Sequence, residues 1–338
     1  MRWPSSWPSP HGYRRWKRIQ AASEWASSLP SEPPSCMLCP MSPSSPVHGA
    51  PDPGTVPLPV NYDSPTELSV MLDGLGLGMR KKYGQNFLIS GNSRRRIAAL
   101  FGVEPGTRAW EIGPGAGSMT REALVAGLTV SAFEIDKGFA EFIRSSYGAT
   151  PGFELYEGDF VRTWPDALAA SGKPGLAFGN LPYNAAGAII VSLIEGGVRP
   201  ARMVFTVQKE AAQRMCASPG TKNYAAFTVL CRSAYTVKTA FDLSPGCFWP
   251  QPRVISSVVV MESRGDAVPF AGEKAFTGFT RACFSSRRKT LRNNLKAAGF
   301  SEDVLAAACG SVGVSPDARA ETLTPELFSA LYVAIKPS

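Results

Sequence analysis

Histidine is almost missing from this chain of 338 residues. The two histidines, His11 and His48, both lie among the first 60 residues, so the rest of the sequence contains none. Nucleophilic catalysis by a Ser-His or Cys-His pair and histidine-based metal sites are therefore excluded from that larger part of the chain. We expect no metal, and a chemistry that depends on positioning and electrostatics.

Long apolar runs are missing as well. No stretch approaches the roughly 18 consecutive apolar residues of a membrane span, so the sequence predicts a soluble protein without a membrane partner. The seven cysteines are odd in number and irregularly spaced, which favours a reducing compartment, the cytoplasm, over a disulfide framework. Cys36 and Cys39 resemble half a zinc site, but no second pair follows them.

The composition divides the chain into a tail and a globular part. Residues 1–60 are dense in Pro and Ser and show no apolar period, so we predict a disordered tail there, which a start codon assigned too early would also explain. The remaining chain can bury a core, since 44% of the residues are apolar. We predict a sheet domain over 61–264, entered through an amphipathic segment at Ser64–Leu72, and a small helical domain over 265–338.

A glycine loop follows the first predicted strand. The run Glu111–Gly117, preceded by Arg108–Trp110 and followed by a helix-like stretch, indicates strand, loop and helix. Glycines there allow the backbone to approach a ligand closely, and the first N–H groups of the helix stay free to donate. A dinucleotide fingerprint is excluded because it needs glycine at Ser118, and a loop that serves packing alone remains an alternative.

Four predicted strands end in polar residues, namely Glu111, Glu134, Asp159 and Asn180. In open α/β sheets the carboxyl ends of the strands share one edge, where ligands bind. Glu134 ends the second strand at a spacing that suits ribose hydroxyls. Asp159 follows the third strand and could accept from an adenine amine. The pattern predicts a ligand that contains a nucleoside.

The motif Asn180-Leu181-Pro182-Tyr183 stands where the apolar strand Leu176–Phe178 ends. An Asn side chain can hydrogen-bond an exocyclic amine, and Pro offers a carbonyl without an N–H of its own. A Tyr ring can stack on a planar base. The alternative is an ordinary turn, in which Asn caps a helix and Pro ends the strand.

Together with Gln85–Leu88, these motifs resemble those of the ribosomal RNA adenine N6,N6-dimethyltransferase family, over nearly everything after residue 60. Within that family the chain is most similar to the bacterial small-subunit branch, because Phe284–Leu295 resembles its C-terminal run. The resemblance implies an α/β fold, with a Rossmann-like methyltransferase sheet domain and a small C-terminal helical domain. It implies S-adenosylmethionine as the cofactor. The family's cofactor contacts carry over onto Asn86, Leu88, Gly113, Glu134, Asp159 and Asn180.

The same resemblance assigns the catalytic residues. The Asn180 side chain and the Pro182 carbonyl would hydrogen-bond the N6 amine of adenine and favour its tetrahedral form, while Tyr183 stacks on the ring. Phe248, in a segment that matches the family's F-x-P-x-P-x-V pattern, is the candidate for the other face of the ring. Phe248 could equally be core, since the strand Val258–Val260 follows, and Trp249 departs from the small residue expected beside it.

Positive charge is concentrated in the C-terminal part of a chain with a formal net charge of +8. The candidate RNA-binding residues are Arg287, Arg288, Lys289 and Arg292. No acid interrupts residues 281–296, and Phe284, Leu291 and Leu295 recur at helical spacing, which predicts a helix with one core face and one cationic face. Two further clusters, Arg80–Lys82 and Arg94–Arg96, favour phosphate contacts, although a solvated surface explains any one cluster.

Three functions follow from this sequence. The first is dimethylation of N6 on two adjacent adenosines near the 3′ end of 16S rRNA, by a cytoplasmic monomer whose partner is the immature small subunit. The second is a 23S rRNA adenine N6-methyltransferase of the antibiotic-resistance type. The third is a non-catalytic ribosome-assembly or nucleic-acid-binding factor.

Overall fold

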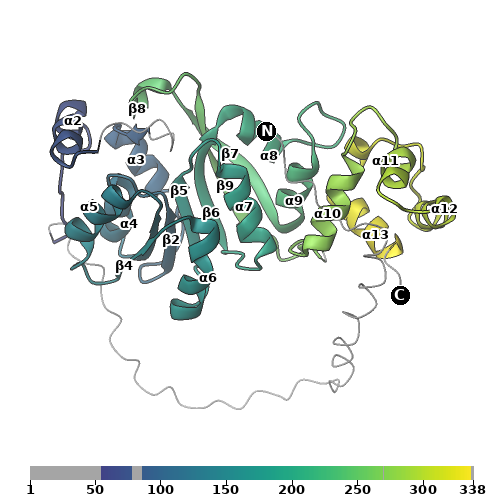
Figure 1. Cartoon of the computed structure of the whole chain (residues 1–338), viewed down its shortest axis with the longest axis horizontal. Helices are drawn as coiled ribbons and strands as arrows, with labels where there is room; N and C mark the ends of the chain where they lie inside the picture. The colour runs from purple at the N-terminus through teal and green to yellow at the C-terminus, as the bar shows by residue number, and fades with distance from the viewer. Residues whose placement is uncertain (1–54, 78–85, 269, 336–338) are drawn as a thin grey trace, which may run out of the picture. The chain divides into compact units, whose positions relative to one another are not determined.

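The computed structural model describes residues 55–77, 86–268 and 270–335 (Figure 1). Chain contacts group residues 48–338 into one compact unit, and the predicted boundary at residue 264 stays a prediction. Several predictions fall outside the described residues: the tail up to residue 54, the Cys36 and Cys39 pair, the cluster Arg80–Lys82, and Gln85. For residues 55–60 the prediction of a disordered tail is wrong, because Val56 and Val60 are buried. Within the described ranges, no helix is long and apolar enough to cross a membrane.

The secondary structure alternates strands and helices. Its elements are α2 (Pro65–Gly74), β1 (Phe87–Leu88), α3 (Gly91–Ala98), β2 (Arg108–Ile112), α4 (Ser118–Val125), β3 (Thr129–Glu134), α5 (Lys137–Tyr147), β4 (Phe153–Glu157), α6 (Phe160–Ser171), β5 (Leu176–Asn180), α7 (Ala186–Glu195), β6 (Arg202–Gln208), α8 (Lys209–Cys216), α9 (Ala226–Ala234), β7 (Tyr235–Leu243), β8 (Phe248–Trp249), β9 (Ser256–Ser263), α10 (Lys274–Cys283), α11 (Leu291–Ala297), α12 (Glu302–Ser311) and α13 (Pro325–Ile335). This alternation of strand and helix is typical of a parallel α/β sheet.

The main sheet has seven strands in the order β4-β3-β2-β5-β6-β9-β7. The first five strands of this order are parallel, and β9 runs antiparallel to both of its neighbours. The order reverses between β2 and β5, which defines the point at which open α/β sheets bind their ligands. The predicted α/β Rossmann-like fold is confirmed. β1 and β8 form a separate two-stranded sheet.

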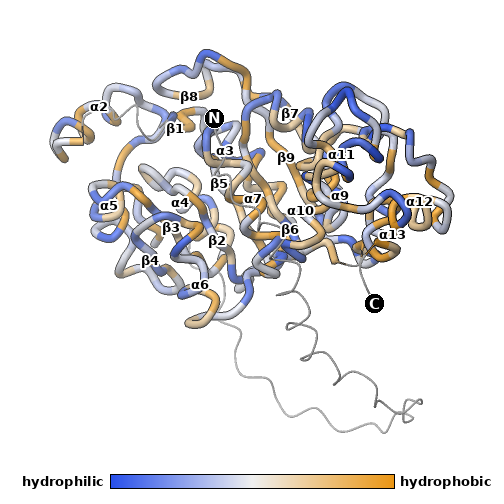
Figure 2. The backbone as a smooth tube through the Cα atoms, turned by 45° about the vertical axis from the view of Figure 1, so that its right-hand side comes forward, coloured by the Kyte–Doolittle hydropathy of each residue, from blue (hydrophilic) through white to orange (hydrophobic). Residues whose placement is uncertain are grey.

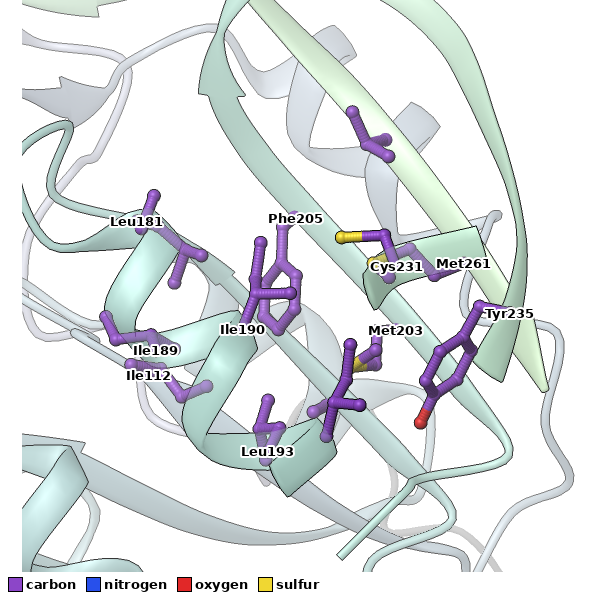
Figure 3. Packing of buried hydrophobic residues seen from close by; sticks show 14 of the residues in the cluster. Ile112, Leu181, Ile189, Ile190, Leu193, Met203, Phe205, Cys231, Tyr235 and Met261 are labelled. Atoms are coloured by element: carbon purple, nitrogen blue, oxygen red, sulfur yellow. The ribbon is translucent and has the colours of Figure 1, made fainter. Parts of the chain in front are cut away.

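Helices cover both faces of this sheet, so its strands are buried on both sides, as expected for parallel strands. One face carries α3, α4 and α5, and the other carries α6, α7 and α9. In Figure 3, Ile190 and Leu193 of α7 lie close to Met203 and Phe205 of β6. Val204, between those two residues, belongs to the opposite core, as the alternation of side chains along a strand requires.

Apolar residues follow the layers of the fold. Figure 2 shows hydrophobic colour along the central strands and α7. Burying a Leu or Ile side chain contributes about 1.5–3 kcal/mol, so the fully buried α7 residues hold that helix firmly on the sheet. Because α7 begins directly after the Asn180–Tyr183 motif, this packing also fixes the motif.

The predicted amphipathic segment near residue 64 is confirmed as α2. Ser64 caps the helix by accepting from the N–H of Glu67, and Pro65 stands at its first turn. Leu68 and Leu72, four residues apart on one face, are buried. The segment 55–77 therefore packs on the body of the protein, and its contacts continue to the pocket described below.

The C-terminal helices α10 to α13 share one apolar core, which also takes in Ala217, Tyr224 and Val229 of the preceding part of the chain. The helical prediction after residue 270 is confirmed. The prediction of one basic helix over 281–296 is wrong. Helix α10 ends at Cys283, and α11 begins only at Leu291 with Thr290 as its cap, so Arg287–Lys289 lie in the intervening turn. Serine and threonine side chains compete for backbone hydrogen bonds and favour such turns and caps over helix interiors.

Candidate active site at the carboxyl edge of the sheet

A pocket opens where β2, β3 and β5 end. Its lining residues are Asn86, Phe87, Leu88, Glu111, Gly113, Pro114, Gly115, Ser118, Met119, Glu134, Ile135, Asn180, Leu181, Pro182 and Tyr183. They come from β1, the glycine loop, the start of α4, and the ends of β3 and β5. The predicted residues Asn86, Leu88, Gly113, Glu134, Asn180, Pro182 and Tyr183 are thus brought together at the switch point of the sheet.

The glycine loop forms one wall of this pocket. Gly113, Gly115 and Gly117 all have positive φ, at 72°, 55° and 86°, which L side chains rarely adopt. A Cβ atom built on Gly113 would meet nothing within 4 Å, so this stretch of backbone is open to a ligand. A Cβ atom on Gly117 would lie 2.7 Å from the ring of Tyr147, so this glycine is required by packing.

Glu134 closes the end of β3 against the loop. Its carboxylate accepts from the N–H of Gly115 at 3.0 Å and from the N–H of Asp136 at 2.9 Å. The side chain is buried, and burial raises its pKa, although the backbone hydrogen bonds oppose that shift. Two fixed carboxylate oxygens at the pocket wall are suited to accept from a pair of hydroxyl groups.

Glu111 is a pocket residue to which the sequence assigned no role of its own. It is 1% exposed and accepts from the Thr120 hydroxyl at 2.6 Å. Burial raises the pKa of Glu111 to about 8, with the Thr120 hydrogen bond opposing the shift and the charge of Glu134 adding to it. The sequence pattern that could have identified Glu111 is an acidic residue at the end of an apolar strand, Arg108–Ile112, directly before the glycine loop. The pocket-lining residues that sequence reasoning missed also include Phe87, Pro114, Gly115, Ser118, Met119, Ile135 and Leu181.

Asn180 is held by a contact across the pocket wall. Its side-chain N–H donates to the carbonyl of Asn86 at 2.8 Å. No hydrogen bond among the described residues uses the side-chain oxygen of Asn180, so this oxygen is left as an acceptor. The strand end comes this close to β2 because residue 179 is glycine: a Cβ atom there would lie 2.4 Å from the carbonyl oxygen of Ile112.

Pro182 and Tyr183 complete this wall. The hydroxyls of Tyr183 and Ser256 are 2.7 Å apart, which ties the half-buried ring to β9. Burial raises the pKa of Tyr183, so the phenol stays neutral. The Pro182 carbonyl already accepts from the N–H groups of Ala185 and Ala186, both at 2.9 Å. Its predicted bond to an amine therefore stays a prediction, because these contacts compete for the same oxygen.

Two predicted site residues lie outside the pocket. Asp159 is exposed and caps α6, accepting from the N–H of Val161 at 3.0 Å, which is the common use of Asp after a strand. Phe248 is 1% exposed and belongs to the core, because β8 pairs with β1 and directs this side chain inward. Trp249 instead stacks with Phe87, with ring centroids 6.4 Å apart. The roles predicted for Asp159 and Phe248 stay predictions without support from this arrangement.

The four candidate RNA-binding residues divide into two pairs. Arg287 contacts Glu321 at 2.8 Å and donates to the carbonyl of Thr221 at 3.1 Å. Arg292 lies 3.5 Å from both Glu302 and Asp317. Arg288 and Lys289 are exposed, and neither side chain has an ion pair or a hydrogen bond to the described residues. Of these four residues, only Arg288 and Lys289 therefore have side chains that are free to contact RNA.

A Rossmann-like sheet with this strand order, an antiparallel β9 between β6 and β7, and a pocket at its switch point together match the predicted fold class, that of a methyltransferase sheet domain. Two solved structures share the fold. A dimethyladenosine transferase from Plasmodium falciparum matches with a TM-score of 0.58 and 23% identity, over 72% of this chain and 94% of that one. The 23S rRNA methyltransferase ErmE matches with a TM-score of 0.54 and 22% identity, over 74% and 99%.

The chain belongs to the ribosomal RNA adenine dimethylase family, whose model matches residues 76–336. It is similar to the ribosomal RNA small subunit methyltransferase A of Treponema denticola, with 43% identity over 271 residues, 78% of this chain and 92% of that protein. The protein of the same name from Acidobacterium capsulatum is 36% identical over 255 residues, 75% of this chain and 90% of that protein. The protein is therefore an enzyme that depends on S-adenosylmethionine.

The residues of the pocket fit this cofactor. The Glu134 carboxylate can accept from ribose hydroxyls, and the backbone at Gly113 is open to close approach. Met119 and Ile135 offer apolar surface for a purine beside the buried Leu88.

Proposed function

We propose that this protein transfers methyl groups from S-adenosylmethionine to N6 of two adjacent adenosines near the 3′ end of 16S rRNA. The observation that carries the proposal is the placement of the Asn180 acceptor and the Tyr183 ring in one pocket with Glu134 and the glycine loop. The names of the relatives, small subunit methyltransferase A, support the small-subunit substrate.

The proposed reaction needs no strong base. S-adenosylmethionine, when bound, supplies a methyl group that its sulfonium has already activated. The chain then has to hold an amine in line at near-attack distance, which is a problem of positioning. The absence of histidine after residue 48 agrees with this chemistry, because no proton must be removed before the attack.

Asn180 addresses the weakness of the nucleophile. The N6 lone pair of adenine is delocalised into the ring, and it attacks only as the nitrogen becomes tetrahedral. An acceptor placed on an N–H of that amine stabilises the positive charge that develops, more in the transition state than before it. The Asn86 carbonyl orients the Asn180 amide so that its oxygen can serve as this acceptor. Tyr183, tied to Ser256, offers a fixed ring for stacking on the base.

The proposed partner is 16S rRNA within the immature small subunit, met in the cytoplasm by a monomer. Arg288 and Lys289, exposed and uncommitted in the turn before α11, support phosphate contacts. Neither alternative is favoured by an observation. The likeness to a 23S rRNA methyltransferase concerns the fold alone at 22% identity.

The experiment uses labelled S-adenosylmethionine with separate immature small and large subunits. We expect label only in the small subunit, recovered as N6,N6-dimethyladenosine after nuclease digestion. Label confined to the large subunit would contradict the small-subunit assignment. Binding of the cofactor and the subunit without any transfer would favour a non-catalytic assembly factor.

Two variants separate binding from turnover. Asn180→Ala should lower kcat on the order of 100-fold or more while cofactor affinity falls only modestly, because its acceptor serves the developing charge. Glu134→Ala should instead weaken cofactor binding by about 10- to 100-fold, as expected from the loss of charge-assisted hydrogen bonds. Calorimetry with S-adenosylmethionine measures both affinities, and equal losses in the two variants would contradict this division.

A further inference from the structure

Arg94 is a buried arginine on α3 that the proposed reaction does not use. The sequence placed it with Arg95 and Arg96 in a cationic cluster for RNA phosphates. For Arg94 this prediction is wrong, because the residue is only 6% exposed and its guanidinium is bonded inside the protein. The neighbouring Arg95 and Arg96 are exposed, and Arg96 lies over the ring of Phe241.

The guanidinium of Arg94 joins three parts of the chain. One terminal nitrogen donates to the carbonyl of Leu88 at 3.0 Å, and the other lies 2.7 Å from the carboxylate of Asp63. The Nε atom lies 3.8 Å from the carboxylate of Glu122 on α4. The flat guanidinium also lies 5.6 Å from the centre of the Tyr62 ring, within reach of a cation–π contact.

Each of these partners leads to the pocket. Leu88 lines it, and the Asn86 carbonyl two residues earlier holds the Asn180 amide. β1 consists of two residues, and among the strands that the structure describes they pair only with β8, so few backbone hydrogen bonds fix β1. The hydrogen bond from Arg94 to the Leu88 carbonyl is therefore an important part of what fixes β1, and with it this wall of the pocket.

The segment 55–77, which carries Asp63, supports the opposite wall. The hydroxyls of Tyr62 and Tyr147 are 2.7 Å apart and buried. Tyr62 shares an apolar cluster with Ala116 of the glycine loop, and a Cβ atom on Gly117 would lie 3.4 Å from the Tyr62 hydroxyl. This segment therefore packs behind the glycine loop, while nearly all of it precedes residue 76, where the family match begins.

We propose that Arg94 is a positioning residue for the cofactor pocket. One terminal nitrogen of its guanidinium donates to the Leu88 carbonyl and the other contacts the Asp63 carboxylate, so Arg94 links the segment 55–77 to β1. That coupling sets the spacing between β1 and the glycine loop, and with it the affinity for S-adenosylmethionine. The inference rests on the proposed cofactor site, and it adds a residue outside the pocket that controls this site.

The forked shape of arginine makes the inference specific. Lysine keeps the charge but offers a single ammonium group, which cannot bond the Leu88 carbonyl and Asp63 in the same two directions. Methionine keeps the apolar stem and removes both charge and donors. The side chain of Asp63 is 56% exposed, so solvent compensates its loss of a partner better than it compensates the buried Leu88 carbonyl. Variants at residue 94 should therefore cost more than variants at residue 63.

The test measures S-adenosylmethionine affinity by calorimetry on the full chain, without RNA. We expect Arg94→Met and Arg94→Lys each to weaken binding by about tenfold, and Asp63→Asn by less. This is the size of effect that is typical of residues that orient ligand-contacting groups without touching the ligand. At saturating cofactor, kcat should stay within about twofold of the parent, because the coupling acts on binding. Arg95→Met, an exposed neighbour on the same helix, is the matched control and should leave S-adenosylmethionine affinity unchanged.

Combining Arg94→Met with Asp63→Asn separates coupling from general damage. The double variant should bind no worse than Arg94→Met alone, since the two residues act through one contact. Unchanged affinity in Arg94→Met and Arg94→Lys, even with a lower melting temperature, would overturn the proposal. If Arg94→Met fails to fold, Arg94→Lys and Asp63→Asn still decide it. Failure of the parent to methylate small subunits would overturn the proposed function while leaving this binding test intact.

Discussion

A buried acid below the glycine loop makes the pocket sensitive to pH at the scale of one residue. Within the described part of the chain, the Glu111 carboxyl has only Thr120 as a hydrogen-bond partner, and it stands close enough to Glu134 to feel its charge. The folded protein therefore holds a proton on Glu111 up to a pKa of about 8, whereas the unfolded chain releases it near the ordinary value of 4.5. Charging this residue opposes folding.

This linkage predicts how stability depends on pH. Between about pH 5 and 8 the native state binds more protons than the unfolded state, so the free energy of unfolding should fall as pH rises through this window. The slope should be on the order of 1 kcal/mol per pH unit. Glu111→Gln, which stays neutral, should give a flatter profile in urea denaturation. The exposed Glu104→Gln serves as the control, and a parent profile that is level across the window would contradict the expectation.

At this scale, sequence reasoning found residues whose chemistry is tied to a motif. Asn180, Glu134 and Gly113 stand at strand ends or in the glycine loop, where spacing alone predicts their common edge. Sequence reasoning could not predict that the Arg94 side chain is buried. Arg94 and Arg95 are identical in kind and adjacent in sequence, and only the packing of Asp63 and Leu88 around one of them decides which is buried.

The element that carries the free cations is a turn built around Asn294. This side chain is 2% exposed and donates to the carbonyls of Cys283 at 2.7 Å and Ser286 at 3.0 Å. Its oxygen accepts from the Ser285 hydroxyl at 3.1 Å and the Ser286 N–H at 3.2 Å. All four hydrogen-bonding positions of the amide are used, which fixes the turn that presents Arg288 and Lys289.

Replacing this amide should disorder the turn without touching the pocket. Asn294→Asp removes both donors and places a carboxylate against two carbonyls, so we expect a loss of about 2–4 kcal/mol in unfolding free energy. Affinity for the small subunit should fall, while calorimetry should show unchanged binding of S-adenosylmethionine. Asn293→Asp, the exposed neighbour, introduces the same charge and controls for it. Equal losses of subunit affinity in the two variants would exclude the turn as the cause.

The helices that flank this turn were predictable, and the break between them was not. Leu291 and Leu295 are fully buried, as their spacing requires, but Phe284 lies at the end of α10. The periodicity of apolar residues continues across the turn by coincidence of spacing. The decisive contacts of Asn294 span eight to eleven residues, beyond what a helical pattern records.

At the scale of the whole molecule, the net charge of +8 favours association with RNA, and exposed cations without a partner are the ones best placed to contact phosphates. Each phosphate contact releases counterions and adds about 0.7–0.9 to the salt slope of binding. Replacing Arg288 and Lys289 together by Ala should lower this slope by about 1.5 in subunit-binding titrations. Arg287→Ala, which loses its contact with Glu321, should instead change stability and leave the slope nearly unchanged. The reverse ranking would show that RNA competes for the paired arginine.

The sequence was sufficient to predict the architecture of the sheet as far as its five parallel strands. Alternating strands and helices predict parallel neighbours and a shared carboxyl edge, which the order β4-β3-β2-β5-β6 confirms. The insertion of β9 between β6 and β7 depends on antiparallel pairing between segments far apart in sequence. The burial of Phe248 follows from the pairing of β8 with β1, also a long-range contact.

Gly179 sets a limit on how this molecule can evolve. The space that its missing side chain would occupy is already filled by the carbonyl oxygen of Ile112. Every missense change of a single nucleotide in a glycine codon introduces a residue with a Cβ atom, and none of these would let β5 stay beside β2. Any amino-acid replacement at this codon is therefore expected to separate the two strands whose ends form the floor of the pocket.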